Sequence, residues 1–263
     1  MKREIIPPKK DIKTVYPFID GIFILNLLSR EDRYQHIVSE LTRSNLTDYV
    51  YIIRSEKDNE NFLRGCYESH LFATKLSLLM NMGTTLVFED DFRVSDKFFE
   101  KLERYVRRLP ENWYRLMLGH IPVFPKYDFK HRMFYGKCLC STGYLFSREF
   151  AEWMPDYDFV QEIENREYLK DRFSFIYGTG YDHILCYLIP RQTYQAIPPL
   201  VLVDEKCGTQ TDHPHGFWSG QFGSFLTTEK GQRLLTFFPL IMYIFLALRA
   251  VGLGKFIERR LFG

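Results

Sequence analysis

Residues 84–91 read Thr-Thr-Leu-Val-Phe-Glu-Asp-Asp and join a short apolar segment directly to three carboxylates. An apolar run of this length after a glycine, here Gly83, is typical of a strand buried on both faces of a sheet. In open α/β sheets, ligands bind beyond the carboxyl ends of the strands, where Glu89-Asp90-Asp91 should lie. This stretch therefore predicts both the fold class and the place of a functional site.

Apolar and amphipathic segments alternate on both sides of this strand. Residues 18–28 form a dense apolar run, whereas residues 30–45 carry apolar side chains at helical spacing among many charges. The same patterns predict strands at residues 49–54, 113–118, 138–147 and 200–203, and helices at residues 60–82, from Ser95 as the cap, 148–154 and 181–189. Strands that alternate with helices imply an α/β domain with a mainly parallel central sheet flanked by helices on both faces.

The chain of 263 residues is long enough for one large α/β domain. We expect residues 1 to about 16 to be a flexible lead-in and residues 17–225 to form the domain. Residues 226–263 are apolar and basic and should form a C-terminal helical appendage.

Composition excludes some functional classes. With 46% hydrophobic and 26% charged residues, the chain has the balance of a globular protein. The net charge of +2, with no basic run interleaved with aromatics and no zinc-finger spacing, predicts no nucleic-acid partner. The five cysteines suggest no disulfide framework, and residues 1–13 lack an apolar export signal, so we expect a cytoplasmic protein.

The acidic triplet suggests a metal site. On an extended backbone Glu89 and Asp91 share one face, while Asp90 points away. Two carboxylates on one face repel each other unless a cation lies between them, and a hard divalent cation would also hold a diphosphate. The alternative is a solvated loop in which Asp90 or Asp91 caps local backbone groups.

Three stretches of the chain match the pattern of a known family in the same order. They are Ile24-Leu25-Asn26-Leu27 followed by Arg30, Asp32 and Arg33; Gly65-Cys66 with Ser69-His70; and Gly83 with the acidic triplet. On these residues the chain resembles glycosyltransferase family 25, which includes bacterial lipooligosaccharide glycosyltransferases and collagen β-galactosyltransferases. Weaker similarities occur at residues 142–147, 181–182 and 198–203.

The resemblance implies a GT-A type fold, a nucleotide-sugar donor that is usually a uridine diphosphate sugar, and Mn²⁺ or Mg²⁺. It implies transfer with inversion, often of galactose, to a glycan, lipid-linked or protein hydroxyl. Residues 155–179 and those after Asp212 match the family poorly, and these regions would shape the acceptor site.

Asn26, Arg30 and Arg33 are the first candidates for donor contact. They lie at or just past the end of the first strand, and a guanidinium offers paired donors that suit a diphosphate. The alternative is a helix whose first turns carry surface salt bridges with Glu31 and Asp32.

Four further residues are assigned to the donor, namely Ser69, His70, Glu89 and Asp90. Ser69 and His70 lie in the helix before the acidic strand and would contact the ribose or the sugar. Alternatively, both are polar groups satisfied where this helix packs on the sheet.

Asp182 is the candidate catalytic base, because an inverting transfer needs a carboxylate to accept the proton of the acceptor hydroxyl. Its alternative role is a first-turn acid that a helix dipole favours. His213 or His215 would add a metal ligand to Glu89 and Asp91, and imidazole suits Mn²⁺ better than Mg²⁺. Otherwise both histidines belong to an exposed loop.

Residues 234–248 are nearly all apolar and are flanked by Lys and Arg. The segment is shorter than the ~20 residues that span a bilayer as a helix. Such a segment can lie in a membrane interface, so residues 230–263 are a candidate for peripheral membrane contact. The alternatives are packing on the domain, packing in a dimer interface, or a membrane span.

The sequence therefore predicts a metal-dependent glycosyltransferase with a single GT-A-like domain. One alternative is a metal-dependent nucleotidyl or phosphoryl transferase, although no glycine-rich phosphate loop is present. The other is a non-catalytic sugar-binding or membrane-associated scaffold.

Overall fold

The computed structural model of the protein describes residues 2–122, 125–156, 185, 188–204 and 207. The predicted C-terminal appendage lies outside these residues, as does most of the helix predicted at residues 181–189. No helix in the described ranges is long and apolar enough to cross a membrane.

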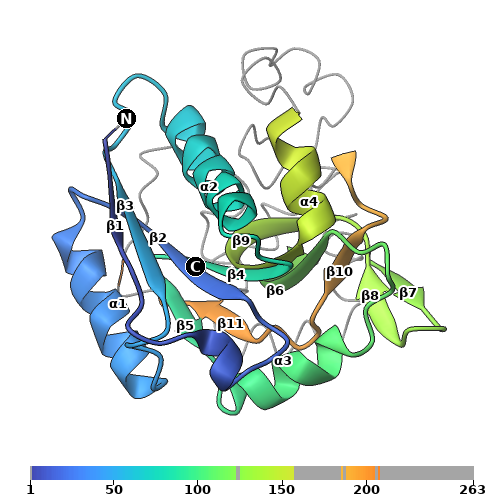
Figure 1. Ribbon diagram of the computed structural model, residues 1–263. Helices are drawn as coiled ribbons and strands as arrows, with labels where there is room; N and C mark the ends of the chain where they lie inside the picture. Colours follow the sequence, from blue (N-terminus) through green and yellow to red (C-terminus); the bar gives the residue numbers. More distant parts are fainter. Residues whose placement is uncertain (1, 123–124, 157–184, 186–187, 205–206, 208–263) are drawn as a thin grey trace, which may run out of the picture.

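A nine-stranded sheet forms the centre of the molecule, in the order β1-β3-β2-β4-β9-β6-β10-β8-β7 (Figure 1). Its strands are β1 (Arg3–Ile6), β2 (Gly21–Leu27), β3 (Tyr51–Ser55), β4 (Thr84–Glu89), β6 (Arg115–Pro122), β7 (Lys126–Asp128), β8 (Met133–Tyr135), β9 (Cys138–Ser147) and β10 (Thr193–Gln195). A second sheet pairs β5 (Phe92–Val94) with β11 (Val201–Val203). The helices are α1 (Glu31–Arg43), α2 (Phe62–Leu79), α3 (Phe98–Val106) and α4 (Arg148–Trp153), with short 3-10 turns η1 (Ile12–Thr14) and η2 (Met154–Asp156).

The main sheet is mixed, so the prediction of a mainly parallel sheet is wrong. Parallel pairings join β2 to β3, β2 to β4 and β6 to β10, whereas every other neighbouring pair is antiparallel. The reason is that β9 inserts between β4 and β6. No helix connects β8 to β9, and a strand without a crossover connection can return antiparallel to its neighbour.

Each face of the sheet has its own hydrophobic core. In β2, Ile22 and Ile24 pack in the core that includes residues of α1 and α3, while Phe23 and Leu25 pack in the core that includes residues of α2 and α4. Figure 1 shows α1 and α3 on one side of the sheet and α2 and α4 on the other. A strand buried on both faces has no polar side to present, which explains the continuous apolar run at residues 18–28.

The N-terminal residues do not form the flexible lead-in predicted for residues 1–16. Strand β1 pairs antiparallel with β3, which places Ile5 opposite Ile53 and Ile6 opposite Ile52. Farther along, Ile12 is only 2% exposed in the core. The segment is ordered because it covers the edge of β3, which would otherwise present unpaired backbone groups.

The other predicted elements within the described ranges are found with small shifts in their ends. Ser95 is an exception, because α3 begins at Phe98 and its cap position is Lys97, which has a left-handed φ of 54°. The backbone N–H of Ser95 instead donates to Leu200 O at 2.9 Å, which joins β5 to the chain before β11. The strand predicted at residues 200–203 therefore lies in the small sheet and not in the main one.

The small sheet packs very closely on the main sheet at two glycines. A Cβ atom added to Gly143 would lie 2.9 Å from Cγ2 of Val201 and 3.1 Å from Cδ1 of Phe88. At Gly119, an added Cβ would lie 3.0 Å from Val201 O. The absence of side chains at these positions therefore lets β11 lie against β6 and β9.

Gly143→Ala is expected to lower the free energy of unfolding by about 1–3 kcal/mol, because the added methyl group overpacks the contact with Val201. Urea denaturation measures the change. The double variant Gly143→Ala/Val201→Ala should lose less than the sum of the two single variants, because the smaller side chain makes room. Additive losses would mean that the two residues do not meet.

Candidate functional site

Polar side chains collect at one edge of the main sheet. Strands β2, β3, β4, β6 and β10 run in the same direction and end at this edge, which we call the carboxyl edge. The polar residues at or near these strand ends are Asn26, Arg54, Glu89, Asp90, Asp91, His120 and Gln195. The predicted acidic site is therefore part of a longer polar row.

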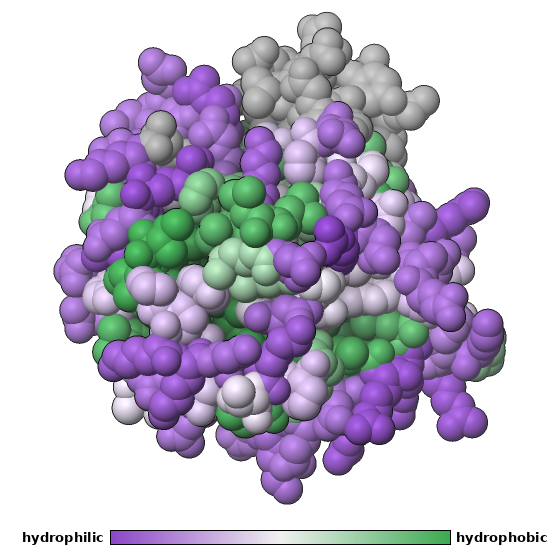
Figure 2. Space-filling view, viewed as in Figure 1, coloured by the Kyte–Doolittle hydropathy of each residue, from purple (hydrophilic) through white to green (hydrophobic). Residues whose placement is uncertain are grey.

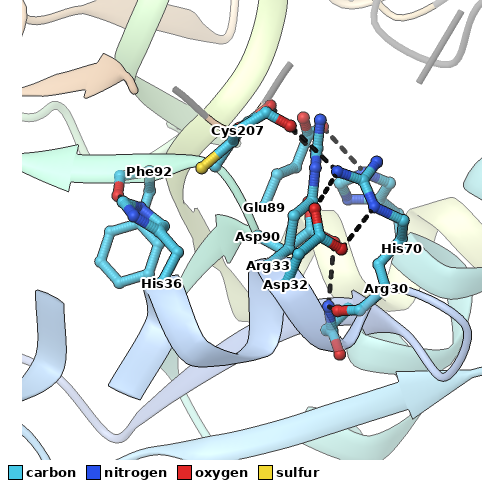
Figure 3. A network of polar contacts seen from close by, with 11 residues as sticks. Arg30, Asp32, Arg33, His36, His70, Glu89, Asp90, Phe92 and Cys207 are labelled. Carbon is cyan, nitrogen blue, oxygen red and sulfur yellow. Dashed lines mark hydrogen bonds and ion pairs between the residues drawn. The ribbon is translucent and has the colours of Figure 1, made fainter. Parts of the chain in front are cut away.

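A buried network fixes the turn that follows β4. Arg33 on α1 is 4% exposed and forms an ion pair with Asp90, which is also 4% exposed (Figure 3). Asn26 Nδ2 donates to Asp90 Oδ2 at 3.0 Å, and Arg54 Nε donates to Asn26 Oδ1 at 3.1 Å. Asn26, Arg33 and Asp90, all assigned to donor contact, are thus brought together, but they bond to one another. Their contact with a donor stays a prediction.

Asp91 lies in the same turn in a different electrostatic environment. Its side chain is 16% exposed, and Arg33 Nη1 lies 3.3 Å from its Oδ2. Its Oδ1 is buried and has no hydrogen-bond partner among the described residues. Burial, with a smaller contribution from Glu89, raises the pKa of Asp91 from 3.8 to about 7, although Arg33 opposes the shift. The ionised form of Asp91 is therefore disfavoured, because Arg33 offsets only part of the cost of its burial.

Glu89 faces the opposite side of the sheet from Asp90. Its Oε1 lies 3.4 Å from Nε2 of His70 on α2, and Nδ1 of His70 lies 2.8 Å from the hydroxyl of Tyr144 on β9. His70 is 1% exposed, whereas the Glu89 side chain is 33% exposed. His70 therefore positions Glu89 from the side of the sheet that α2 covers. Tyr144 had no predicted role, although it lies in the stretch at residues 142–147 that carries a weak family similarity.

The two remaining candidates have local partners. Arg30 forms two hydrogen bonds with Asp32, at 2.8 and 2.6 Å, as in the alternative of a helix-end salt bridge. Ser69 Oγ donates to Gly65 O at 2.9 Å within α2. A role for Arg30 or Ser69 in binding a donor stays a prediction.

A segment after β11 lies against the acidic turn, which the sequence analysis did not foresee. Asp204 N donates to Asp91 O at 2.7 Å, and Arg30 Nη2 donates to Cys207 O at 2.9 Å. Cys207 is 8% exposed, and burial raises the pKa of its thiol to about 11, so it is an unreactive thiol. The sequence gives little sign of this contact, because Asp204 and Cys207 take part through main-chain atoms, which any residue type provides.

His120 and Gln195 extend the polar row beyond the acidic turn. They are 2% and 0% exposed, and Gln195 Nε2 donates to Gly136 O and Lys137 O, at 3.1 Å each. Neither ring nitrogen of His120 has a hydrogen-bond partner in the described part of the chain. Burial lowers the pKa of His120 to about 3, with Gln195 opposing, so the imidazole is neutral. In the sequence, the sign of this site was a histidine just past the strand predicted at residues 113–118.

Glu89 and Asp91 fit a divalent cation in part. The unpartnered Oδ1 of Asp91 and its raised pKa match a carboxylate that gains from a cation. Within the described residues, no group of three or more His, Cys, Asp or Glu side chains is placed to hold a metal ion. The predicted ligands His213 and His215 and the predicted base Asp182 lie outside these residues, so the complete ligand set stays a prediction.

Comparisons with known proteins give a distant structural similarity only. No protein family model matches the sequence, and no curated protein matches it. One similar solved structure is a glycosyltransferase involved in the glycosylation of the major capsid of PBCV-1, with a TM-score of 0.41 and 11% identity, over 72% of this chain and 94% of that one. Another is A197 from STIV, with a TM-score of 0.36 and 12% identity, over 74% of this chain and 97% of that one.

Asp91→Asn is expected to stabilise the metal-free protein at about pH 8. A carboxyl whose pKa is about 7 when folded and 3.8 otherwise contributes stability at low pH that is lost as the pH rises through this window. The gain in stability should be larger at about pH 8 than at about pH 4. Thermal melting in chelating buffer measures it, since each kcal/mol raises the melting temperature by about 2–4 °C.

Asp90→Asn is the matched control for this prediction, because it removes the neighbouring charge that pairs with buried Arg33. This variant should lose stability at about pH 8. If Asp91→Asn also loses stability there, Asp91 is a structural partner of Arg33 and not an uncompensated charge.

His120→Gln is expected to flatten the acid limb of the stability profile. The unfolded chain binds a proton at this residue below about pH 6.5, whereas the folded chain resists it until about pH 3. The wild type should therefore lose up to about 1.4 kcal/mol per pH unit through this group as the pH falls. Urea denaturation at several pH values measures the slope, and an unchanged slope in the variant would contradict the buried neutral state.

Proposed function

We propose that this chain is a glycosyltransferase that moves a sugar from a nucleoside diphosphate sugar to an acceptor hydroxyl, with Asp91 and Glu89 holding a divalent cation. The observation that carries the proposal is the buried, unpartnered carboxylate oxygen of Asp91 at the carboxyl edge of the sheet. Arg33 contacts only Oδ2 of Asp91, so burial of the other oxygen without a hydrogen bond costs stability, and buried carboxylates with shifted pKa values are characteristic of functional sites.

The residues around Asp91 suit this function. Arg33 and Asp90 fix the turn by an internal ion pair, so Asp91 is held without rotating into solvent. Glu89 remains 33% exposed while His70 orients it, which leaves it accessible to a ligand. A bound divalent cation would neutralise charge on the diphosphate as the sugar leaves.

Arg30 is the described arginine best placed for a donor phosphate. Its side chain is 25% exposed, compared with 4% for Arg33, and its guanidinium lies beside Cys207 O at the acidic turn. Exchange of the exposed Asp32 carboxylate for a phosphate would keep the same planar pairing.

The finer assignments follow from the family resemblance. A relationship to glycosyltransferase family 25 would make a uridine diphosphate sugar, and galactose in particular, the first donor to test. Inverting transfer would need a base such as Asp182, and imidazole ligands from His213 or His215 would favour Mn²⁺.

Calorimetry with uridine diphosphate sugars, with and without Mn²⁺, tests the proposal. We expect one donor to bind in a metal-dependent way and Asp91→Asn to weaken that binding at least about tenfold, because a carboxylate ligand of the cation is lost. Asp48→Asn is the control, since Asp48 pairs with Lys9 and Lys10 away from the acidic turn.

A turnover assay then separates the alternatives. Release of nucleoside diphosphate together with a new glycoside supports glycosyl transfer, whereas release of pyrophosphate or transfer of phosphate indicates a nucleotidyl or phosphoryl transferase. If the folded protein binds no donor with or without metal, the proposal is wrong and the scaffold alternative is favoured.

A further inference from the structure

The β7–β8 hairpin is a well-formed projection at one end of the main sheet. Tyr127 pairs with Phe134 and Asp128 pairs with Met133, and β7 is the last strand in the sheet order. Figure 1 shows the hairpin at the side of the molecule, next to β10. Its connecting loop, residues 129–132, therefore points away from the body of the sheet.

The loop is held in one shape by Asp128. Its Oδ1 accepts hydrogen bonds from Lys130 N at 3.0 Å and His131 N at 3.1 Å, and its Oδ2 lies 2.7 Å from His131 Nδ1. The carboxylate of Asp128 is therefore bonded within the hairpin itself. The loop therefore presents its other side chains from a fixed backbone.

The presented side chains include aromatic rings that the protein does not cover. Phe129 is 85% exposed and Tyr127 is 41% exposed. The Tyr127 ring packs edge-on against Phe129 and also against Phe134, with centroids 5.0 Å apart in both pairs. Adjacent aromatic rings that stay exposed together are a candidate contact surface for another molecule.

Basic residues lie next to these aromatic residues in the hairpin sequence. Lys126, Lys130 and Arg132 are exposed, and none of them forms an ion pair with a residue that the structure describes. The acidic side chain nearby, Asp128, is paired with His131. The hairpin therefore has an apolar tip with an excess of positive charge around it.

Another exposed apolar site on the protein is aliphatic and contains no aromatic ring. Leu79 is 84% exposed and Met80 is 40% exposed at the end of α2. Figure 2 shows that apolar atoms also reach the surface over the middle of the face that it presents. The last turn of α2 contains no basic residue, but Lys75 is exposed one turn earlier and Arg148 donates to Asn81 Oδ1 at 2.6 Å. The hairpin is thus distinguished by an exposed aromatic ring beside several cations that have no ion pair among the described residues.

We propose that the β7–β8 hairpin docks the protein on an anionic membrane surface, with Phe129 in the interface and Lys126, Lys130 and Arg132 on the lipid headgroups. Aromatic rings favour the interfacial region of bilayers, and each nearby cation adds attraction to anionic lipid. A convex tip suits a deformable lipid surface better than a sugar, which binds in concave sites. This inference does not depend on the proposed function.

Co-sedimentation of the full chain with vesicles tests the proposal. The wild type should bind vesicles made of equal parts phosphatidylserine and phosphatidylcholine, but not pure phosphatidylcholine. Phe129→Ser should weaken this binding about tenfold through the lost apolar contact. Lys130→Glu/Arg132→Glu should weaken it at least as much and reduce its dependence on salt. Leu79→Ser is the matched control and should bind like the wild type.

Melting curves check that each variant is folded, which the exposure of the substituted side chains favours. The proposal is overturned if the wild type fails to bind the anionic vesicles. It is also overturned if Phe129→Ser binds like the wild type, which would assign binding to another segment such as residues 230–263. An equal loss in Leu79→Ser would show general apolar adhesion and overturn it as well.

Discussion

The buried ion pair between Arg33 and Asp90 is the interaction on which the candidate site depends. It joins the first turn of α1 to the turn after β4, and Asn26 extends the link to β2. Removing one partner of a buried pair typically costs about 3–5 kcal/mol, because the remaining charge is left uncompensated. The pair also sets apart the neighbouring carboxylates. Asp90 is satisfied inside the protein, whereas Asp91 has one oxygen without a partner and Glu89 reaches the surface.

Much of the fold could be predicted from the sequence, because burial leaves a periodic pattern. The strand at residues 84–88 and the helices at residues 30–45 and 60–82 are confirmed, since each buries an apolar face with its own period. Strand direction was predicted wrongly at β9, because a strand buried on both faces has the same composition whether it runs parallel or antiparallel. The edge strand β1 was missed because Arg3 and Glu4 give it a polar composition.

The candidate site was predictable only where it is local in sequence. The acidic triplet and the arginines after the first strand are brought together as expected, yet the partner that each one takes was not encoded in spacing. Tyr144 reaches His70 from a distant strand, and His120 depends on the irregular pairing of β6 with β9. Such contacts arise from tertiary packing, so single-sequence patterns do not contain them. Asp182, His213 and His215 lie beyond the described residues, and their roles stay predictions.

The main-chain bonds that attach the segment after β11 to the acidic turn have an evolutionary consequence. Asp204 is bound through its backbone N–H and Cys207 through its carbonyl oxygen, so neither bond requires a particular side chain at these positions. A substitution at either position can therefore be inherited without removing the bond to the acidic turn, although it alters the Asp204–His36 ion pair or the buried thiol of Cys207.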